Sequence, residues 1–365
     1  MHSPHLRVRI AHFNNVANMA FNYVLALRRH GQDATLIFER DTHEFSRPEW
    51  ESPNALRERW VKPIQTLSGK AGLVGLRSAS AILELSNYDF ISAWDTGPIW
   101  AQWAGKPYVV HSAGGDLFAA VEGRTPRQWL LRRGYEHAKC LVYYLPYQKN
   151  AIGRLRTRRL AFARLPIDED RYSPGPESGQ FSDLRHWETL LFCPSRHNWQ
   201  LKGTDVMLRA YADALRVEEN INLELVSWGS DLEKSRELCT HLGLGGHITW
   251  IPPMNKEDLI GMYRTCDVVL DQFVLGSYGM TAVESLMCGK PVVIKIEGYE
   301  DHYTDPLPFV NSHDQHDLAD SIVTLAQDHS LIRVKSQESR LWALKHHSYA
   351  SVSAEYLQLV SELTA

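Results

Sequence analysis

Two cations, Arg196 and Lys202, lie six residues apart in one short polar stretch. The stretch follows an apolar run at 189–193 and precedes a helical pattern that begins at about Thr204. This order predicts a strand, a loop and a helix. Two cations beside a helix N-terminus can hold a diphosphate, because charge pairing and the helix dipole act together. The sequence therefore predicts an anion site at this loop. The alternative is a pair of exposed loop cations without a ligand.

A second stretch with chemical potential places two glycines, Gly276 and Gly279, ahead of a helical pattern at about 280–288. Glycine lets the backbone approach a ligand closely. Glu284 lies just over one turn into this helix, among apolar residues, where its carboxylate could accept two hydrogen bonds from a ribose diol. An unpaired buried carboxylate would be costly. We therefore predict that Glu284 binds a ligand.

These two stretches resemble the retaining glycosyltransferases of family 4, the group 1 glycosyl transferases. The positions that match, in chain order, are Arg196, Lys202-Gly203, Tyr278-Gly279, Glu284 and Gly289-Lys290-Pro291-Val292-Val293. The resemblance covers the second half of the chain well and the first half by its rhythm and a few loop residues. It implies the GT-B fold, in which two Rossmann-like α/β domains face one another across a cleft.

The resemblance also implies roles for individual residues. Arg196 and Lys202 would hold the diphosphate of a nucleotide-sugar donor, and Glu284 would hold its ribose. The other donor-binding predictions are residues in loops and at a helix start, namely Asn18, Gly229, Gly279, Met280 and Thr281. The predicted catalytic residues are His111, Asp116 and Asp271.

One departure from the family pattern affects the chemistry. The family's paired glutamates are eight residues apart, and the residue eight before Glu284 is Gly276. Asp271 could reach the same space, or backbone groups near Gly279 could hold the sugar. We predict a retaining glycosyltransferase that needs neither a metal ion nor a cofactor. A nucleotide-sugar epimerase, a phosphorolytic enzyme and a non-catalytic partner subunit are alternatives, and Gly276 is the best argument for the last.

Length and hydrophobic patterning predict the domain organisation. A chain of 365 residues exceeds what one core usually supports. We expect an N-terminal acceptor-side domain at 1–172, a linker at 173–187, a donor-binding domain at 188–340 and a C-terminal helix at 341–365 that could cross back. The predicted strands are 8–13, 34–38, 89–94, 107–111, 140–145 and 160–165 in the first half, and 189–193, 223–227, 248–251, 268–270 and 292–296 in the second.

Composition adds an expectation about location. The chain has no apolar run of about 18 residues and no signal-peptide pattern. We therefore expect it in the cytoplasm or at the inner face of the membrane. Its five cysteines are widely spaced, which predicts reduced, buried thiols.

The charge distribution suggests an anionic partner. Residues 124–164 contain eleven Lys or Arg and one acid, so eleven minus one gives a net charge of about +10. Such a segment could meet an anionic membrane, or an acceptor such as a lipid-linked glycan. Few aromatic residues interleave these cations, so we do not expect nucleic-acid binding. A solvated helical face is the alternative.

Overall fold

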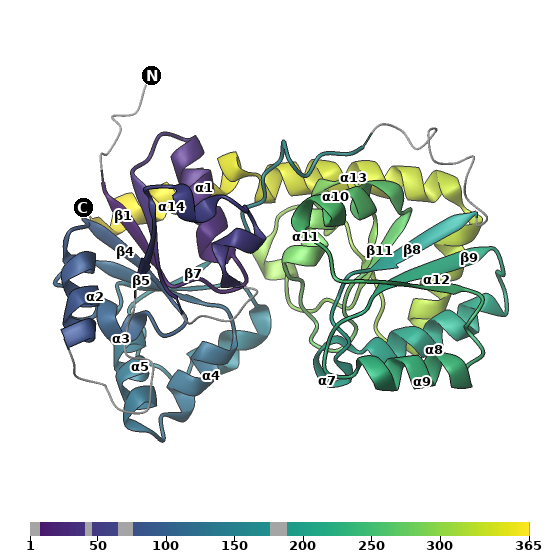
Figure 1. Ribbon diagram of the computed structural model, residues 1–365, viewed down its shortest axis with the longest axis horizontal. Helices are drawn as coiled ribbons and strands as arrows, with labels where there is room; N and C mark the ends of the chain where they lie inside the picture. The colour runs from purple at the N-terminus through teal and green to yellow at the C-terminus, as the bar shows by residue number, and fades with distance from the viewer. Residues whose placement is uncertain (1–7, 41–45, 65–75, 176–187, 365) are drawn as a thin grey trace. The chain divides into compact units, whose positions relative to one another are not determined.

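The structure is a computed structural model, and it describes residues 8–40, 46–64, 76–175 and 188–364. The chain forms two compact units (Figure 1). Unit 1 consists of Met1–Asp168 with Ser348–Ala365, and unit 2 consists of Glu169–His347. The sequence had drawn these boundaries at residues 172 and 341. Most of the linker expected at 173–187 lies outside the described residues.

Unit 1 is built on a parallel sheet. Its strands in the described residues lie in the order β3-β2-β1-β4-β5-β6-β7. They are β1 (Ile10–Phe13), β2 (Ala34–Glu39), β3 (Val61–Ile64), β4 (Phe90–Trp94), β5 (Tyr108–Ser112), β6 (Cys140–Tyr143) and β7 (Leu160–Phe162). The strand order reverses between β1 and β4, which makes this edge the switch point of a doubly wound sheet. Strand β3 was not predicted, since Lys62 and Pro63 interrupt its apolar pattern.

Helices cover both faces of this sheet. They are α1 (Met19–Arg29), α2 (Leu76–Ser86), α3 (Pro98–Ala101), α4 (Gly115–Glu122), α5 (Pro126–His137), α6 (Lys149–Ile152) and the C-terminal α14 (Tyr349–Thr364). Helices α1 and α14 pack against one another on one face. Because side chains alternate along a strand, Ala11 and Phe13 join the core formed with α2 to α6, whereas His12 packs against Tyr23 of α1 and Tyr356 of α14.

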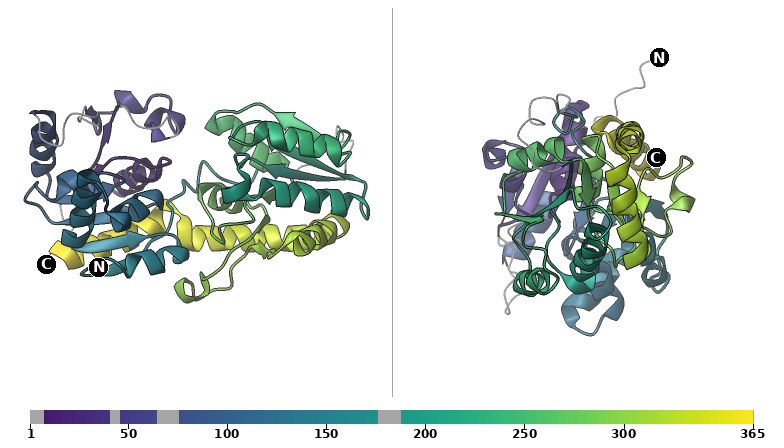
Figure 2. Two further views of the ribbon diagram at one scale, coloured as in Figure 1. Left: turned by 90° about the horizontal axis from the view of Figure 1, so that it is seen from below. Right: turned by 90° about the vertical axis from the view of Figure 1, so that its right-hand side faces the viewer.

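Unit 2 repeats the design with a parallel sheet in the order β10-β9-β8-β11-β12-β13. Helices flank its strands (Figure 2). Its strands are β8 (Thr189–Cys193), β9 (Ile221–Val226), β10 (Ile248–Ile251), β11 (Val268–Leu270), β12 (Val292–Ile294) and β13 (Val310–Asn311). Its helices are α7 (Trp199–Lys202), α8 (Thr204–Leu215), α9 (Leu232–His241), α10 (Lys256–Thr265), α11 (Met280–Met287), α12 (Gln315–Gln327) and α13 (His329–His347). The order reverses between β8 and β11, so their carboxyl ends form the switch point of this unit.

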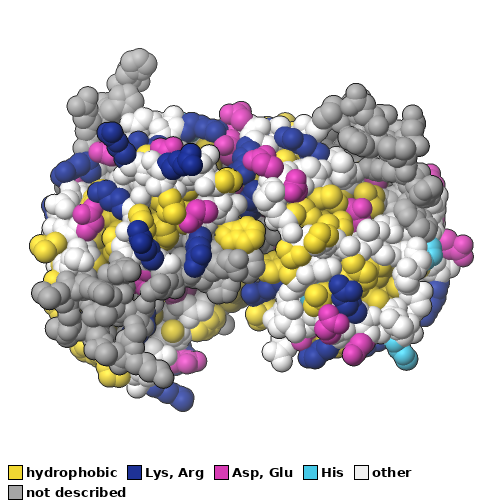
Figure 3. All heavy atoms as spheres, in the orientation of Figure 1, with side chains coloured by type: hydrophobic (Ala, Val, Ile, Leu, Met, Phe, Trp, Pro, Cys, Tyr) yellow, Lys and Arg dark blue, Asp and Glu magenta, His cyan; other side chains and the backbone are white. Residues whose placement is uncertain are grey.

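The surface of unit 1 combines charge with exposed aromatic rings. Lys and Arg side chains are interspersed with hydrophobic ones on its visible face (Figure 3). Among the described residues, four large aromatic side chains of this unit are 39–54% exposed, namely Trp103, Phe118, Trp129 and Tyr147. The guanidinium of Arg133 lies 5.5 Å from the ring centroid of Trp103 and 5.9 Å from that of Trp129.

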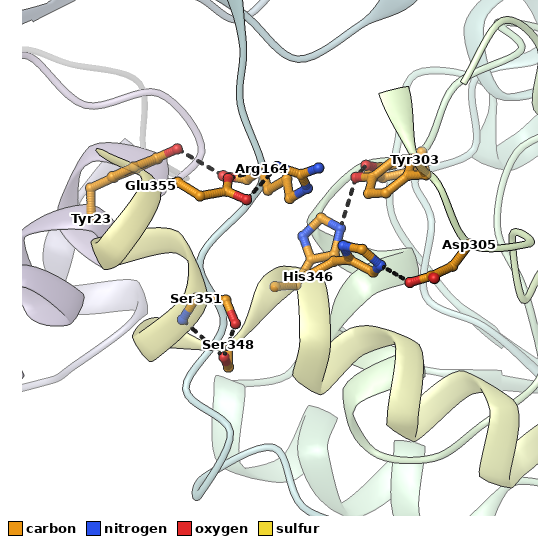
Figure 4. Close-up of polar contacts among 10 residues, drawn as sticks. Tyr23, Arg164, Tyr303, Asp305, His346, Ser348, Ser351 and Glu355 are labelled. Carbon is orange, nitrogen blue, oxygen red and sulfur yellow. Dashed lines mark hydrogen bonds and ion pairs between the residues drawn. The ribbon is translucent and has the colours of Figure 1, made fainter. Parts of the chain in front are cut away.

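Helix α14 neutralises part of the basic segment. Arg159 pairs with Glu362 at 2.5 Å and Arg164 with Glu355 at 2.6 Å. Figure 4 shows the second pair, together with the 2.7 Å hydrogen bond that Tyr23 Oη donates to the carbonyl of Arg164. The net charge counted along 124–164 therefore overstates the charge of the folded surface, because the acids of α14 come from a distant part of the sequence.

Three further expectations concern cysteines, membranes and metals. All five cysteines are buried and unbridged, and burial raises the pKa of the Cys140 thiol to about 11. In the described part of the chain, no helix combines the length and apolar character needed to cross a bilayer. Within the same residues, no three His, Cys, Asp or Glu side chains gather as a metal site would require.

Candidate functional site

The switch point of unit 2 brings together two side chains that are far apart in the sequence. Ser195 follows β8 and Asp271 follows β11. Ser195 Oγ donates a 2.5 Å hydrogen bond to Asp271 Oδ1. The other carboxylate oxygen, Asp271 Oδ2, is buried and has no hydrogen-bond partner among the described residues. A buried carboxylate oxygen without a partner is costly, so this position suits a ligand that donates a hydrogen bond.

Both predicted cations leave the loop between β8 and α8. Lys202 ends the single-turn helix α7, and its Nζ lies 3.7 Å from Asp271 Oδ1 and donates a 2.8 Å hydrogen bond to Gln272 Oε1. Arg196 is exposed, and among the described residues it has no hydrogen bond or ion pair. The structure thus brings Lys202 against the predicted Asp271 and leaves Arg196 available at the same loop.

Two glycines shape this loop. Gly203 has φ of +69°, and a β-carbon there would lie 2.8 Å from the Val274 side chain. Gly229 has φ of +118°, and a β-carbon there would lie 2.5 Å from the backbone nitrogen and oxygen of His197. Any side chain at Gly229 would therefore displace the loop that carries Arg196. This packing explains the glycine without requiring the donor contact that the sequence predicted for it.

The loop from Gly276 to Gly279 opens helix α11. Tyr278 is buried, its ring stacks on that of Tyr299 at 4.4 Å, and its hydroxyl bonds to that of Tyr303. These contacts of Tyr278 fix the backbone that leads into Gly279. A β-carbon placed on Gly279 would have no atom within 4 Å, so the space beside this residue is open. The first N–H groups of a helix lack intrahelical partners. Met280 and Thr281, both half-buried, form the first turn of α11 next to this opening.

Glu284 is buried, as expected, but it is not unpaired. Lys256 Nζ donates to Glu284 Oε1, Tyr172 Oη donates to the same oxygen at 3.3 Å, and Tyr263 Oη donates to Oε2 at 3.4 Å. Burial of this carboxylate therefore needs no ligand to explain it, and that part of the sequence argument is wrong. A role for Glu284 in binding a ribose stays a prediction.

In unit 1 the predicted catalytic histidine lies inside the core. Strand β5 continues to Ser112, so His111 is a strand residue whose side chain points to the face covered by α1 and α14. Its ring stacks on Trp94 at 4.0 Å, and Nδ1 lies 2.6 Å from Tyr144 Oη. Burial lowers the pKa of His111 well below its ordinary value. The sequence had placed this residue at a strand end beside a substrate.

Asp116 lies on helix α4 of the same unit. It is half-buried in the first turn of α4, where its Oδ2 accepts a 2.6 Å hydrogen bond from Tyr135 Oη and its Oδ1 accepts a 3.0 Å bond from the Gly114 amide. Burial, together with the negative charge of Asp95, raises the pKa of Asp116 to about 6. A carboxyl group with this pKa can take up and release a proton near neutral pH.

Asn18 begins α1 and takes part in a network within unit 1. Its Oδ1 accepts a 2.7 Å hydrogen bond from Asn15 Nδ2. Asn14, Ala17 and Asn18 all have positive φ values, so this loop holds a left-handed backbone without glycine. Asparagine tolerates that region better than most residues. Asn18 is buried, and a donor contact for it stays a prediction.

The sequence reasoning missed two polar residues at strand ends, Ser195 and Glu297. Ser195 lies inside the first motif, in which only the cations Arg196 and Lys202 were assigned a role. Glu297 was placed just beyond a strand expected to run to residue 296, but β12 ends at Ile294, which leaves Lys295 to Glu297 in a loop. A polar residue shortly after a buried strand was the available signal in both cases.

Comparison with known proteins gives the chain its relatives. Residues 180–340 match the family model described as Glycosyl transferases group 1. The D-inositol 3-phosphate glycosyltransferase of Corynebacterium jeikeium is 28% identical over 206 residues, which are 51% of this chain and 48% of that protein. The enzyme of the same name from Mycobacterium sp. strain JLS is 31% identical over 297 residues, 73% of this chain and 65% of that protein. The chain thus spans about half the length of the first of these relatives.

Solved structures resemble the whole chain. HepE of Anabaena, in complex with UDP and glucose, matches with a TM-score of 0.74 and 18% identity over 97% of this chain and 99% of that one. Sucrose-phosphate synthase of Thermosynechococcus elongatus matches with a TM-score of 0.73 and 15% identity over 98% and 99%. Two doubly wound units and these neighbours define the GT-B fold. Residues 180–340 match the glycosyl transferases group 1 family, and the resemblance inferred from the motifs is confirmed.

Proposed function

We propose that this protein transfers a sugar from a nucleoside diphosphate sugar to an acceptor hydroxyl, with retention of the anomeric configuration. The observation that carries the proposal is the switch point of unit 2. There Lys202 lies beside Asp271, and the buried oxygen Asp271 Oδ2 has no hydrogen-bond partner among the described residues. The choice of donor is supported by HepE, which has been solved with UDP and with UDP-glucose.

The residues at this edge suit the departure of a diphosphate. Lys202 and Arg196 would neutralise the negative charge that develops on the leaving group, and the N–H groups at Gly279 would add hydrogen bonds from the start of α11. With these cations in place, the proposed reaction needs no metal ion. Asp271 Oδ2 would accept a hydrogen bond from a sugar hydroxyl. Asp116 in unit 1 would exchange a proton with the acceptor hydroxyl.

Replacing Lys202 with alanine tests the diphosphate site. We expect Lys202→Ala to weaken binding of a nucleoside diphosphate by about 1.5–3 kcal/mol, the range for a hydrogen bond to a charged group. Isothermal titration calorimetry with UDP, GDP and ADP, in the presence of EDTA, measures this loss. Lys234→Ala is a matched control, because Lys234 is 63% exposed and pairs with Asp231 in the same unit.

The same titrations separate the alternatives. Unchanged affinity in Lys202→Ala, or loss of wild-type binding in EDTA, would contradict the metal-free diphosphate site. Turnover of a nucleotide sugar without any acceptor would favour an epimerase. Binding of the donor without turnover under any condition would favour a non-catalytic partner subunit, which the glycine at position 276 makes the second candidate.

We further propose that unit 1 docks on an anionic membrane and that the acceptor is a glycan or lipid-linked hydroxyl at that surface. Support comes from the exposed cations that α14 leaves unpaired, such as Arg124, Arg127 and Arg158, and from the exposed Trp103 and Trp129. Tryptophan is enriched at membrane–water interfaces, and each cation near an anionic surface contributes about 1 kcal/mol. The relatives are named for D-inositol 3-phosphate, an anionic compound that a cationic surface would also attract.

Vesicle sedimentation tests the docking. We expect binding to vesicles that contain anionic lipid, and we expect the binding to weaken as salt rises, because a Debye length of about 8 Å at physiological salt screens much of the attraction. A variant with Arg124, Arg127, Arg154 and Arg158 changed to Ser should lose most of this binding. A control variant with Arg209 and Arg216 of unit 2 changed to Ser should keep it. Equal binding to neutral vesicles, or none to anionic vesicles at low salt, would leave a soluble acceptor.

A further inference from the structure

Gly276 lies against a carboxylate from another loop. Its φ is +64°, a backbone conformation that residues other than glycine rarely adopt. A β-carbon placed on Gly276 would lie 3.4 Å from both Cβ and Oε2 of Glu297. The side chain of Glu297 therefore lies at van der Waals distance from the position that a β-carbon at residue 276 would take.

The backbone of Glu297 is held firmly while its side chain stays accessible. Beyond the end of β12, the Lys295 amide donates a 2.9 Å hydrogen bond to the Gln272 carbonyl, and the Glu297 amide donates a 2.9 Å bond to the Gly276 carbonyl. These bonds pin the segment after β12 to the segment between Asp271 and α11. The Glu297 side chain is 62% exposed, so a ligand at this edge can reach it.

Two carboxylates thus border the same loop, at opposite ends of residues 271–276. Asp271 is buried with one oxygen free, and Glu297 is exposed beside Gly276. Lys295 Nζ lies 3.3 Å from Glu297 Oε1 and neutralises part of its charge. Ionised carboxylates accept hydrogen bonds from hydroxyl groups and repel other anions. A sugar that contacts both carboxylates should be rich in hydroxyls and carry no carboxylate of its own.

We propose that Glu297 is a specificity-determining residue that, together with Asp271, binds the hydroxyls of a neutral donor sugar. The inference rests on the proposed function, since it places the sugar of the donor at this edge. It also gives the chain a carboxylate beside Gly276, where the residue itself has no side chain. The structure reaches this arrangement through a residue 21 positions further along the chain than Gly276.

Binding measurements on the full chain test the proposal without requiring turnover. The probes are UDP, GDP and ADP with their glucosyl forms, and the pair that wild type binds most tightly is used. We expect Glu297→Ala to weaken binding of the nucleoside diphosphate glucose about 10- to 100-fold, because a hydrogen bond to a charged group is lost. The bare nucleoside diphosphate should change less than about twofold, because it does not reach Glu297.

Three variants make the result specific. Glu300→Ala removes an exposed glutamate three residues away and should leave both affinities unchanged. Lys295→Met breaks the ion pair and should not reproduce the loss seen in Glu297→Ala. Glu297→Gln removes only the charge, so it should narrow the preference for the glucosyl over the glucuronosyl nucleotide by about tenfold.

Each outcome decides a separate question. If Glu297→Ala weakens the bare nucleotide as much as the sugar nucleotide, or changes neither, the role of Glu297 is overturned while the diphosphate site stands. The same holds if Lys295→Met has the same effect, since the ion pair would then be the cause. If wild type binds none of the nucleotides, the proposed function and this inference fall together. Binding without sugar transfer would remove the catalytic proposal and leave the role of Glu297 to be read from the affinities.

Discussion

Glu284→Gln is expected to lower the free energy of unfolding of unit 2 by about 3 kcal/mol. The substitution leaves the ammonium group of Lys256 facing a neutral amide inside the protein. Removing one partner of a buried ion pair typically costs about 3–5 kcal/mol, and we expect the lower end because the Lys256 side chain keeps 21% of its exposure. For a unit of this size, the melting temperature should fall by roughly 6–12 °C.

The double variant Lys256→Met with Glu284→Gln distinguishes the ion pair from other effects. Removing both charges should recover part of the stability lost in Glu284→Gln, because neither charge is then left unpaired. A double variant that is less stable than both single ones would contradict a dominant role for the pair. Calorimetry on the three variants gives these values.

Nucleotide binding by the same variants decides whether Glu284 also holds a ribose. A carboxylate that serves only the fold should leave the affinity for a nucleoside diphosphate unchanged in Glu284→Gln below its melting temperature. A carboxylate that also binds ribose should lose affinity in both Glu284→Gln and the double variant. The two functions are compatible, because each carboxylate oxygen can accept more than one hydrogen bond.

The fold was largely readable from the sequence because of its parallel sheets. Strands buried on both faces appear as short apolar runs between helical patterns, and every predicted strand is present. Two edge strands were not predicted: β3, whose Lys62 and Pro63 break the apolar pattern, and β13, which has only two residues. An edge strand needs only one row of hydrogen bonds, so it tolerates proline and charge that an inner strand would not.

Fewer features of the site could be predicted from the sequence, because its important contacts join residues that are far apart in the chain. The pairing of Glu284 with Lys256 joins residues 28 positions apart, and nothing in the local pattern around Glu284 points to it. Glu297 reaches Gly276 only because β12 lies beside β11 in the sheet. His111 was expected at the end of its strand, but β5 continues to Ser112, so His111 is an inner strand residue on the sheet face covered by α1 and α14. Residue types and spacing predicted which loops matter, and strand order decided which side chains meet there.

The second large effect concerns acid and the buried histidines of unit 1. Burial lowers the pKa of His12 to about 3 and that of His111 well below its ordinary value of 6.5. At pH 5 His12 is therefore neutral in the folded protein, whereas histidines of the unfolded chain bind protons below about pH 6.5. The unfolded state then holds more protons, so the stability of unit 1 falls as the pH drops. Between pH 7 and pH 5 His12 should cost about 2 kcal/mol, and His111 should change the stability in the same direction.

Asp116 opposes this loss. Its pKa is raised to about 6 in the folded protein, so between pH 7 and pH 5 the folded state takes up a proton that the unfolded carboxylate does not. This uptake raises the free energy of unfolding of unit 1 by about 1.4 kcal/mol over the same pH range. His12 and Asp116 together should therefore lower the stability of unit 1 by less than about 1 kcal/mol from pH 7 to pH 5, and the contribution of His111 adds to this fall.

Substitution of His12 isolates its share of this pH dependence. We expect His12→Asn to reduce the loss of stability between pH 7 and pH 5 by about 2 kcal/mol, whatever its effect at neutral pH, because asparagine does not titrate. Hydrogen exchange of the β1 and β5 amides at pH 7, 6 and 5, corrected for the intrinsic rates, reports on unit 1 alone. His137→Asn, which replaces an exposed histidine on α5, is the control and should leave the slope as it is in wild type. If His12→Asn keeps the wild-type slope, His12 takes up its proton over the same pH range in the folded protein as in the unfolded chain, and the lowered pKa of His12 described for unit 1 is wrong.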